Sequence, residues 1–176
     1  MEINKILDKI SNYDLILFDF DGTLFQTQEF HKKAYKIADK SQSKNRYEIK
    51  CQAFLDLVVK NKVQTKDISL LIYFYISFLK KKKAIVSATL SENVNTILSK
   101  SQINFNFDKI YCGGRLKEKN KPSPFMHIEA MKYFNTCCKK TIILEDSENG
   151  FIAAKKANID CFDVNTHSFY YNVLEE

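Results

Sequence analysis

Four acidic residues of this sequence come in two close pairs, and each pair follows a short apolar run. Asp19 and Asp21 form the first pair, and Glu145 and Asp146 form the second. Carboxylate oxygens are ligands that Mg²⁺ prefers, and a carboxylate can attack phosphorus when a cation screens its charge. The two pairs therefore indicate a magnesium site, provided that the fold brings them together.

A hydroxyl group and a lysine add two further parts of such a site. Ser87 ends another apolar run, and Lys121 lies between that run and the second acidic pair. A phosphate monoester is already anionic, so a catalyst must surround it with positive charge and hydrogen-bond donors and must align a nucleophile. With the acidic residues, Ser87 and Lys121 favour phosphoryl transfer.

The apolar runs predict buried strands of a sheet that is covered on both faces. The five runs are 15–18, 83–87, 109–112, 141–144 and 159–164. Helical patterns separate most of them, and this alternation predicts an α/β fold with a doubly wound, Rossmann-like parallel sheet. Ligands of such sheets lie at the carboxyl ends of the strands, so the acidic pairs and Ser87 should share one edge.

Several helix ends are also predicted. Ser91 and Ser147 should cap the starts of two helices through their hydroxyl groups. The run Lys80 to Lys83 should follow the helix 68–79 and lie at the negative end of its dipole. Asn158 should end the last helix in the left-handed conformation, which asparagine tolerates.

The stretch after Phe25 breaks the alternation of strands and helices. It contains two helical patterns, 29–40 and 48–61, with no strand between them. We expect a small helical cap above the edge that carries the acidic residues. The predicted division is an α/β core of residues 1–25 and 67–176, with a cap of residues 26–66.

Four segments resemble, in order, the four motifs of the haloacid dehalogenase-like superfamily. They are Asp19-Phe20-Asp21-Gly22-Thr23, Ser87, Lys121-Pro122-Ser123-Pro124, and Glu145-Asp146-Ser147 with Gly150. The helical insertion is similar to a shortened form of the cap in the beta-phosphoglucomutase and phosphoglycolate phosphatase branch. The resemblance covers nearly the whole chain and implies the superfamily's α/β core.

The resemblance also implies roles for the two aspartates of the first motif. Asp19 would attack phosphorus and form an aspartyl-phosphate, and Asp21 would protonate the leaving group and then activate water. Thr23 would help to orient Asp21. His31 falls where relatives often have a histidine, and it either faces the substrate, packs within the cap or lies in solvent.

The remaining roles concern the phosphate and the metal. Thr23, Ser87, the Ala88 amide and Lys121 would bind the phosphate. The ligands of Mg²⁺, the implied cofactor, would be Asp19, the Asp21 backbone carbonyl and Asp146. Glu145 would either bind the metal directly or support its ligands.

The resulting functional hypothesis is a Mg²⁺-dependent phosphatase for a phosphorylated metabolite, such as a sugar phosphate or phosphoglycolate. A phosphosugar mutase is an alternative because it shares all four motifs, although the short cap disfavours it. A non-catalytic signalling domain that accepts phosphate on an aspartate is a more remote alternative.

The charge, the length of the apolar runs and the cysteine pattern indicate which partners and sites to expect. The net charge is +6, but the basic residues are spread along the chain, which favours a solvated surface over a nucleic-acid interface. The apolar run 68–79 is shorter than the roughly 20 residues of a membrane span. Five cysteines without a metal-site pattern indicate free thiols. We expect a cytoplasmic protein, monomeric or weakly dimeric, that binds a small phosphorylated substrate but neither nucleic acid nor membrane.

Overall fold

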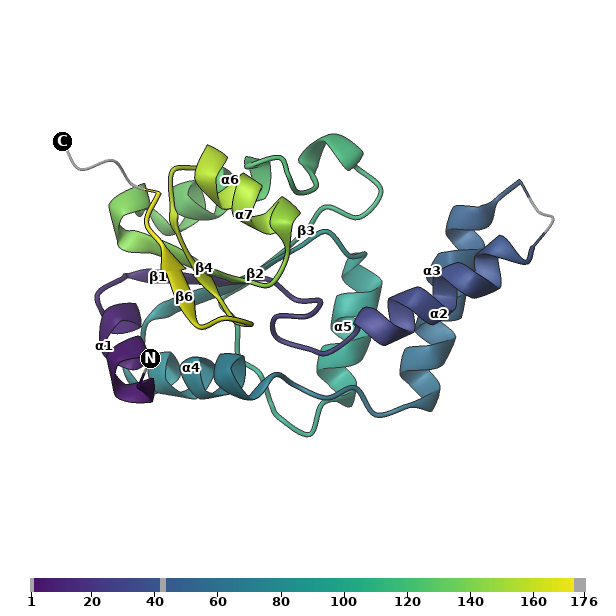
Figure 1. The fold of residues 1–176 in the computed structure, drawn as a ribbon, viewed down its shortest axis with the longest axis horizontal. Coiled ribbons are helices and arrows are strands. Elements are labelled where there is room, and N and C mark those ends of the chain that lie inside the picture. Colours follow the sequence, from purple (N-terminus) through teal and green to yellow (C-terminus); the bar gives the residue numbers. More distant parts are fainter. Residues whose placement is uncertain (1, 42–43, 173–176) are drawn as a thin grey trace.

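The chain folds around a six-stranded sheet with helices on both faces (Figure 1). The computed structural model describes residues 2–41 and 44–172. The strands are β1 (Leu15–Phe18), β2 (Lys82–Ser87), β3 (Lys109–Cys112), β4 (Thr141–Glu145), β5 (Asp160–Asp163) and β6 (Ser168–Tyr170). Their order is β3-β2-β1-β4-β5-β6, and all neighbours are parallel except β5 and β6. The α/β fold and its mostly parallel sheet are confirmed.

Seven α-helices lie in the described part of the chain. They are α1 (Ile3–Ser11), α2 (Gln28–Asp39), α3 (Arg46–Lys60), α4 (Asp67–Phe78), α5 (Ser91–Lys100), α6 (Phe125–Phe134) and α7 (Glu148–Lys156). Helices α1, α4 and α5 contribute to the buried cluster on one face of the sheet, and α6 and α7 to the cluster on the other. The sheet is therefore doubly wound.

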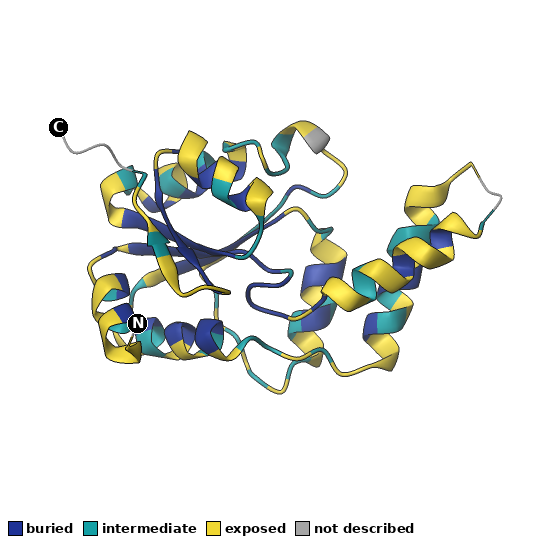
Figure 2. Cartoon of the chain, viewed as in Figure 1, coloured by how far each residue is buried: buried dark blue, intermediate teal, exposed yellow. Residues whose placement is uncertain are grey.

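Alternate side chains of each central strand enter opposite clusters. In β1, Ile16 and Phe18 face α1 and α4, whereas Leu15 and Leu17 face α6 and α7. All four residues are buried (Figure 2). This two-sided burial is why the strands read as uninterrupted apolar runs in the sequence.

Helices α2 and α3 pack against each other and project from the sheet body (Figure 1). The chain leaves the body at Phe25 and returns at Thr65, and a β-bridge joins these two residues. Two buried residues of the helix pair, Ala34 and Phe54, belong to the same apolar cluster as one face of the sheet. The helix pair matches the position of the expected cap, while its status as a separate domain stays a prediction.

Some local features differ from those predicted. Helix α1 and strand β6 were not predicted, because α1 is a short amphipathic helix and β6 an edge strand of three residues. Ser147 caps α7 as expected, with its hydroxyl accepting a hydrogen bond from the Gly150 amide at 3.2 Å. Ser91 makes no such bond, since α5 begins at Ser91 itself, so that prediction is wrong.

The residues that follow α7 and α4 were also predicted. Asn158 has a φ of 56°, as expected for the end of α7. In the run Lys80 to Lys83, the first two residues follow the end of α4 as expected, but Lys82 and Lys83 already belong to β2. The Lys82 ammonium donates to the backbone oxygen of Phe134 at 2.9 Å, and so it stabilises the last residue of α6 rather than the end of α4.

None of the described helices combines the length and the apolar character that a membrane span requires.

Candidate active site

Three carboxylates meet where β1 and β4 end. Phe18 pairs with Leu144 in the parallel register, so the residues that follow, Asp19 and Glu145, are neighbours across the two strands. One oxygen from each of Asp19, Glu145 and Asp146 lies within 4.8 Å of the others. The predicted convergence of the two acidic pairs at one sheet edge is therefore observed for these three residues.

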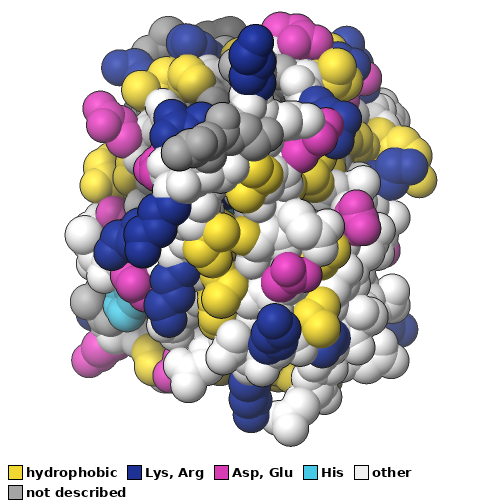
Figure 3. All heavy atoms as spheres, turned by 90° about the vertical axis from the view of Figure 1, so that its right-hand side faces the viewer, with side chains coloured by type: hydrophobic (Ala, Val, Ile, Leu, Met, Phe, Trp, Pro, Cys, Tyr) yellow, Lys and Arg dark blue, Asp and Glu magenta, His cyan; other side chains and the backbone are white. Residues whose placement is uncertain are grey.

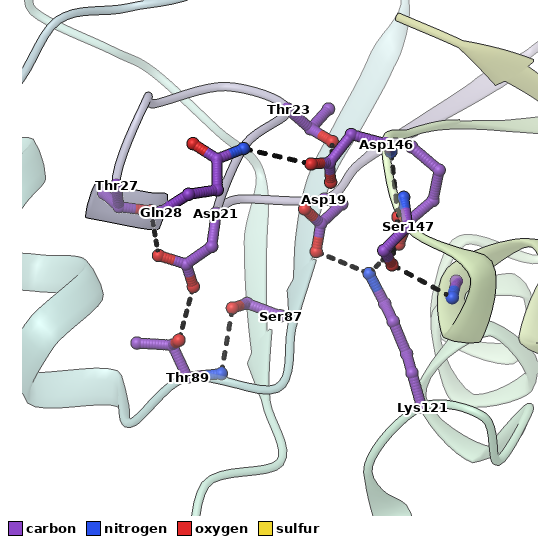
Figure 4. Close-up of polar contacts among 12 residues, drawn as sticks. Asp19, Asp21, Thr23, Thr27, Gln28, Ser87, Thr89, Lys121, Asp146 and Ser147 are labelled. Carbon is purple, nitrogen blue, oxygen red and sulfur yellow. Dashed lines mark hydrogen bonds and ion pairs between the residues drawn. The ribbon is translucent and has the colours of Figure 1, made fainter. Parts of the chain in front are cut away.

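Lys121 lies against two of the three carboxylates (Figure 4). Its ammonium donates to Asp19 Oδ1 at 2.6 Å and also to Glu145 Oε1. Burial lowers the pKa of Lys121, but the charges of Asp19 and Glu145 outweigh burial and raise it above its usual value. Lys121 is therefore a fixed positive charge beside Asp19.

Glu145 has both carboxylate oxygens engaged by donors. While Oε1 accepts from Lys121, Oε2 accepts from the Asp146 amide at 3.1 Å, the Ser147 amide at 3.2 Å and the Ser147 hydroxyl at 3.0 Å. The side chain is fully buried. These bonds tie Lys121 to the start of α7, and they favour an indirect role for Glu145 around a metal over direct ligation.

Asp146 is held by two residues from the segment after β1. Thr23 Oγ1 donates to Asp146 Oδ1 at 3.2 Å, and Gln28 Nε2 donates to Oδ2 at 3.1 Å. The expectation that Thr23 orients Asp21 is wrong, since its hydroxyl contacts Asp146 instead. Gly22 makes this approach possible: its φ is 89°, and a Cβ there would lie 2.1 Å from Asp146 Oδ2.

The site residues fit a divalent cation. Burial, followed by the charge of Glu145, raises the pKa of both Asp19 and Asp146. Among the described residues, Lys121 is the only cation that forms an ion pair with any of these three carboxylates, and Lys66 acts on Asp146 only from a greater distance, which leaves an excess of negative charge in a buried place. A cation bound by Asp19 and Asp146 would offset this excess, and hard oxygen donors are those that Mg²⁺ takes.

The Asp21 carboxylate points away from this cluster, toward the hydroxyl groups of Thr27 and Thr89 (Figure 4). Thr27 Oγ1 donates to Asp21 Oδ1 at 2.5 Å, Thr89 Oγ1 donates to Oδ2, and His31 Nε2 lies 3.0 Å from Oδ1. Burial raises the pKa of Asp21, but the hydrogen bonds and the charge of His31 outweigh it, so the pKa lies below its usual range. Asp21 is therefore held as a carboxylate, apart from the metal-type cluster, and only its backbone could join that cluster.

His31 links the helix pair to the chemistry of the sheet edge. Its ring stacks on Phe54 of α3 with the centroids 4.1 Å apart, while its Nε2 reaches Asp21. His31 thus packs within the helix pair, and it also faces the site through its contact with Asp21. Direct contact with substrate stays a prediction.

Ser87 lies at the end of β2, beside β1, as predicted. Its buried hydroxyl accepts a hydrogen bond from the Thr89 amide at 3.0 Å, which folds the chain after β2 toward Asp21. Ala88 is exposed on this loop. The phosphate contacts of Ser87, Ala88, Lys121 and Thr23 remain predictions.

Three contact residues were missed by reasoning from the sequence: Thr27, Gln28 and Thr89. Thr89 follows Ser87 by two positions, so a second hydroxyl at the strand end was a usable signal. For Thr27 and Gln28 the sequence holds no comparable signal, because their contacts depend on how α2 leaves the loop after β1.

Comparisons with known proteins agree with this arrangement. The family model described as haloacid dehalogenase-like hydrolase matches residues 36–164, from within α2 to just past β5. A search of curated proteins found no match.

Similar solved structures share the fold at low sequence identity. CbbY from Rhodobacter sphaeroides, in complex with phosphate, has a TM-score of 0.74 and 21% identity, with 85% of this chain and 84% of that one covered. The beta-phosphoglucomutase of Clostridium difficile has a TM-score of 0.71 and 21% identity, covering 86% and 84%. A predicted phosphoglycolate phosphatase from Haemophilus somnus 129PT has a TM-score of 0.66 and 19% identity, covering 92% and 88%.

The family model spans well over half of the chain, and the fold and the acidic cluster agree with it. The chain therefore belongs to the haloacid dehalogenase-like hydrolases.

Proposed function

We propose that this protein is a Mg²⁺-dependent phosphatase that hydrolyses a small phosphate monoester through an aspartyl-phosphate on Asp19. The observation that carries the proposal is the buried Asp19 carboxylate, held at 2.6 Å by Lys121 and close to Asp146 and Glu145. Family membership supports hydrolase chemistry, and the solved structures with a similar fold include, by their names, a predicted phosphoglycolate phosphatase and a beta-phosphoglucomutase.

In the first step, a carboxylate oxygen of Asp19 attacks phosphorus, and the bond from phosphorus to the ester oxygen breaks. Asp19 and Asp146, with the Asp21 backbone carbonyl, would hold Mg²⁺, whose charge, when bound, screens the carboxylate from the phosphate. Lys121 remains beside Asp19 and offsets the charge that collects there. Ser87 would donate a hydrogen bond to the transferring group.

Asp21 transfers the proton in each of the two steps. The departing alkoxide takes, by way of Asp21, the proton of the hydrogen bond between His31 Nε2 and Asp21 Oδ1, which leaves Asp21 as a carboxylate. In the second step Asp21 takes a proton from the water that attacks the aspartyl-phosphate, and this proton replaces the one lost in the first step. That attack breaks the bond between Asp19 and phosphorus and releases inorganic phosphate. The carboxylate form seen here suits the second step, and His31, 3.0 Å away, is close enough to share the proton that the first step needs.

The test is hydrolysis of p-nitrophenyl phosphate with and without Mg²⁺, by wild type and by Asp19→Asn. We expect turnover that depends on the metal and falls by at least about a thousandfold in the variant, because the amide cannot act as the nucleophile. Asp8→Asn, a change of an exposed residue in α1, is the matched control and should behave as wild type.

Two results would count against the proposal. Similar turnover by wild type and Asp19→Asn would rule out Asp19 as the phosphoryl acceptor. Weak hydrolysis together with fast interconversion of hexose phosphates would identify a phosphosugar mutase, which uses the same aspartate but returns the phosphoryl group to substrate.

A further inference from the structure

A small cleft opens beside Asp21, between the α2–α3 helix pair and the loops that follow β2 and β3. Its volume is about 360 Å³, and its lining includes His31 and Thr89, both of which contact Asp21. The group proposed to protonate the leaving oxygen therefore lies at one end of this cleft. We call it the leaving-group cleft, since the rest of the substrate must lie where Asp21 can reach the ester oxygen.

Lys50 of α3 is the only basic residue among the described residues that line the leaving-group cleft, and none of these lining residues is acidic. The other polar groups of the lining are uncharged, apart from the imidazole of His31. A substrate in the cleft would therefore meet one full positive charge, placed on the helix pair and not on the sheet edge.

The Lys50 ammonium is bordered by aromatic rings and lacks an acidic partner. It lies 5.0 Å from the ring centroid of Tyr35 and 5.5 Å from that of Phe54. Within residues 2–41 and 44–172, no carboxylate forms an ion pair with it. Partial burial lowers its pKa, and the opposing effects of Cys51 and Asp21 offset only part of that shift. An anionic ligand would supply that counter-ion.

The net positive charge of the segment that forms the helix pair also favours an anionic ligand. Residues 28–60 contain eight Lys and Arg and four Asp and Glu, so this segment, less than a fifth of the 176 residues, holds most of the net charge of +6. Figure 3 views the molecule from the end that carries α2 and α3, where basic and acidic side chains are both spread over the visible face, so the excess of positive charge comes from the residue count and not from one patch. The field around the cleft therefore favours anions.

Resting on the proposed function, we infer that Lys50 binds a second anionic group of the substrate, a carboxylate or another phosphate, at the far end of the leaving group. The protein then selects small monoesters with two acidic groups. The volume of about 360 Å³ lies at the low end of the range for small-molecule sites and suits a metabolite of a few carbon atoms up to one sugar ring.

Matched substrate pairs test this inference, because the members of each pair differ in the second anion. One pair is 3-phosphoglycerate and glycerol 3-phosphate, another is phosphoglycolate and 2-hydroxyethyl phosphate, and a third is glucose 1,6-bisphosphate and glucose 6-phosphate. The first two pairs probe a carboxylate, and the third probes a phosphate. The readout is the ratio of kcat/KM for the two members, so that general effects on activity cancel.

For wild type, we expect the anionic member of at least one pair to be favoured by about tenfold or more. Lys50→Met keeps the apolar stem that packs on the rings but removes the charge, and it should bring that ratio close to one. Lys50→Arg should keep most of the preference. Lys33→Met removes an equal charge from the exposed side of α2, outside the cleft, and should leave the ratio unchanged.

Each possible result is decisive. Equal use of both members in all three pairs by wild type overturns the inference, as does a preference that survives in Lys50→Met or is lost equally in Lys33→Met. Failure of wild type to hydrolyse p-nitrophenyl phosphate with Mg²⁺ would instead reject the proposed function. The two failures are therefore distinguishable.

Discussion

His127 is a buried histidine that the proposed chemistry does not use. It lies in α6 with no exposed surface, and neither ring nitrogen has a hydrogen-bond partner in the described residues. Burial, and then the nearby positive charge of Lys121, lowers its pKa to about 3. The ring is therefore neutral in the folded protein at ordinary pH.

This neutral state predicts a loss of stability in acid. Between the pKa of unfolded histidine, about 6.5, and the folded value, the unfolded chain binds a proton that the folded chain does not, so stability falls as pH falls through this window. At about pH 5 the loss from this group is roughly 2 kcal/mol relative to about pH 7.5. His127→Leu should remove that part of the pH dependence, and it should cost little at neutral pH because it deletes unsatisfied polar atoms.

Urea unfolding at the two pH values measures this effect. Met126→Leu, a change of the buried neighbour in α6 that does not titrate, is the matched control and should keep the wild-type difference between the two pH values. An acid-induced loss of the same size in His127→Leu and wild type would contradict the assignment.

At the scale of single residues, the sequence predicted which groups meet at the site better than it predicted what each one contacts. The residues that converge all lie at the carboxyl ends of the strands or on a loop at that edge of the sheet. They are Asp19, Lys121, Glu145 and Asp146. The partner of Thr23 was predicted wrongly. A hydroxyl chooses its acceptor from distances of a few tenths of an ångström, and no sequence pattern encodes these.

Helix α7 and strand β4 approach each other closely at Gly150. A Cβ on this residue would lie 1.9 Å from the carboxyl carbon of Glu145, and Glu145 cannot move aside without giving up Lys121 and the Ser147 hydroxyl. The absence of a side chain at Gly150 thus lets the helix start directly above the buried carboxylate.

Gly150→Ala is expected to displace the Glu145 carboxylate. Because Lys121 bonds to both Glu145 and Asp19, the Asp19 oxygen that accepts from Lys121 should move as well. We predict a loss of at least about a hundredfold in kcat with Mg²⁺, because misplacing catalytic groups by about 1 Å has effects of this size. Asn149→Ala, at the exposed neighbouring position of the same helix, should retain wild-type activity. Normal turnover by Gly150→Ala would show that Glu145 tolerates the added methyl group.

At the scale of elements, the five parallel strands were predictable within a residue or two, and β1, β2, β4 and β5 read as apolar runs because they are buried. The short edge strand β6 gave no such run. Helix starts were less predictable: Ser147 caps α7, whereas Ser91 is already helical. The Lys80 to Lys83 run shows the limit most clearly. Its charges suit the end of α4, but β2 begins at Lys82, and tertiary pairing with β1 overrides the local preference.

For the whole molecule, the concentration of positive charge on the α2–α3 end predicts a salt-dependent association with anionic substrates. Raising ionic strength from about 10 mM to about 200 mM shortens the screening length severalfold, so kcat/KM for a phosphate ester should fall severalfold while kcat changes little. KCl titrations at constant Mg²⁺ measure this, and changing Lys32 and Lys33 together to Gln should flatten the dependence. A kcat/KM that is independent of KCl would contradict the prediction.

The place where the helix pair joins the sheet body has a consequence for how such a molecule diversifies. Since Phe25 and Thr65 are bridged, the outgoing and returning segments lie side by side, and Gln26 and Gln64 are hydrogen-bonded through their backbones at 2.8 Å. An insert between two adjacent anchor points can be lengthened, shortened or exchanged without changing the register of β1 against β2 and β4. The start of the insert must stay, because Thr27, Gln28 and His31 contact Asp21 and Asp146. The rest of the helix pair can vary, so selection can change which substrate is bound while the groups proposed to cleave the bond are kept.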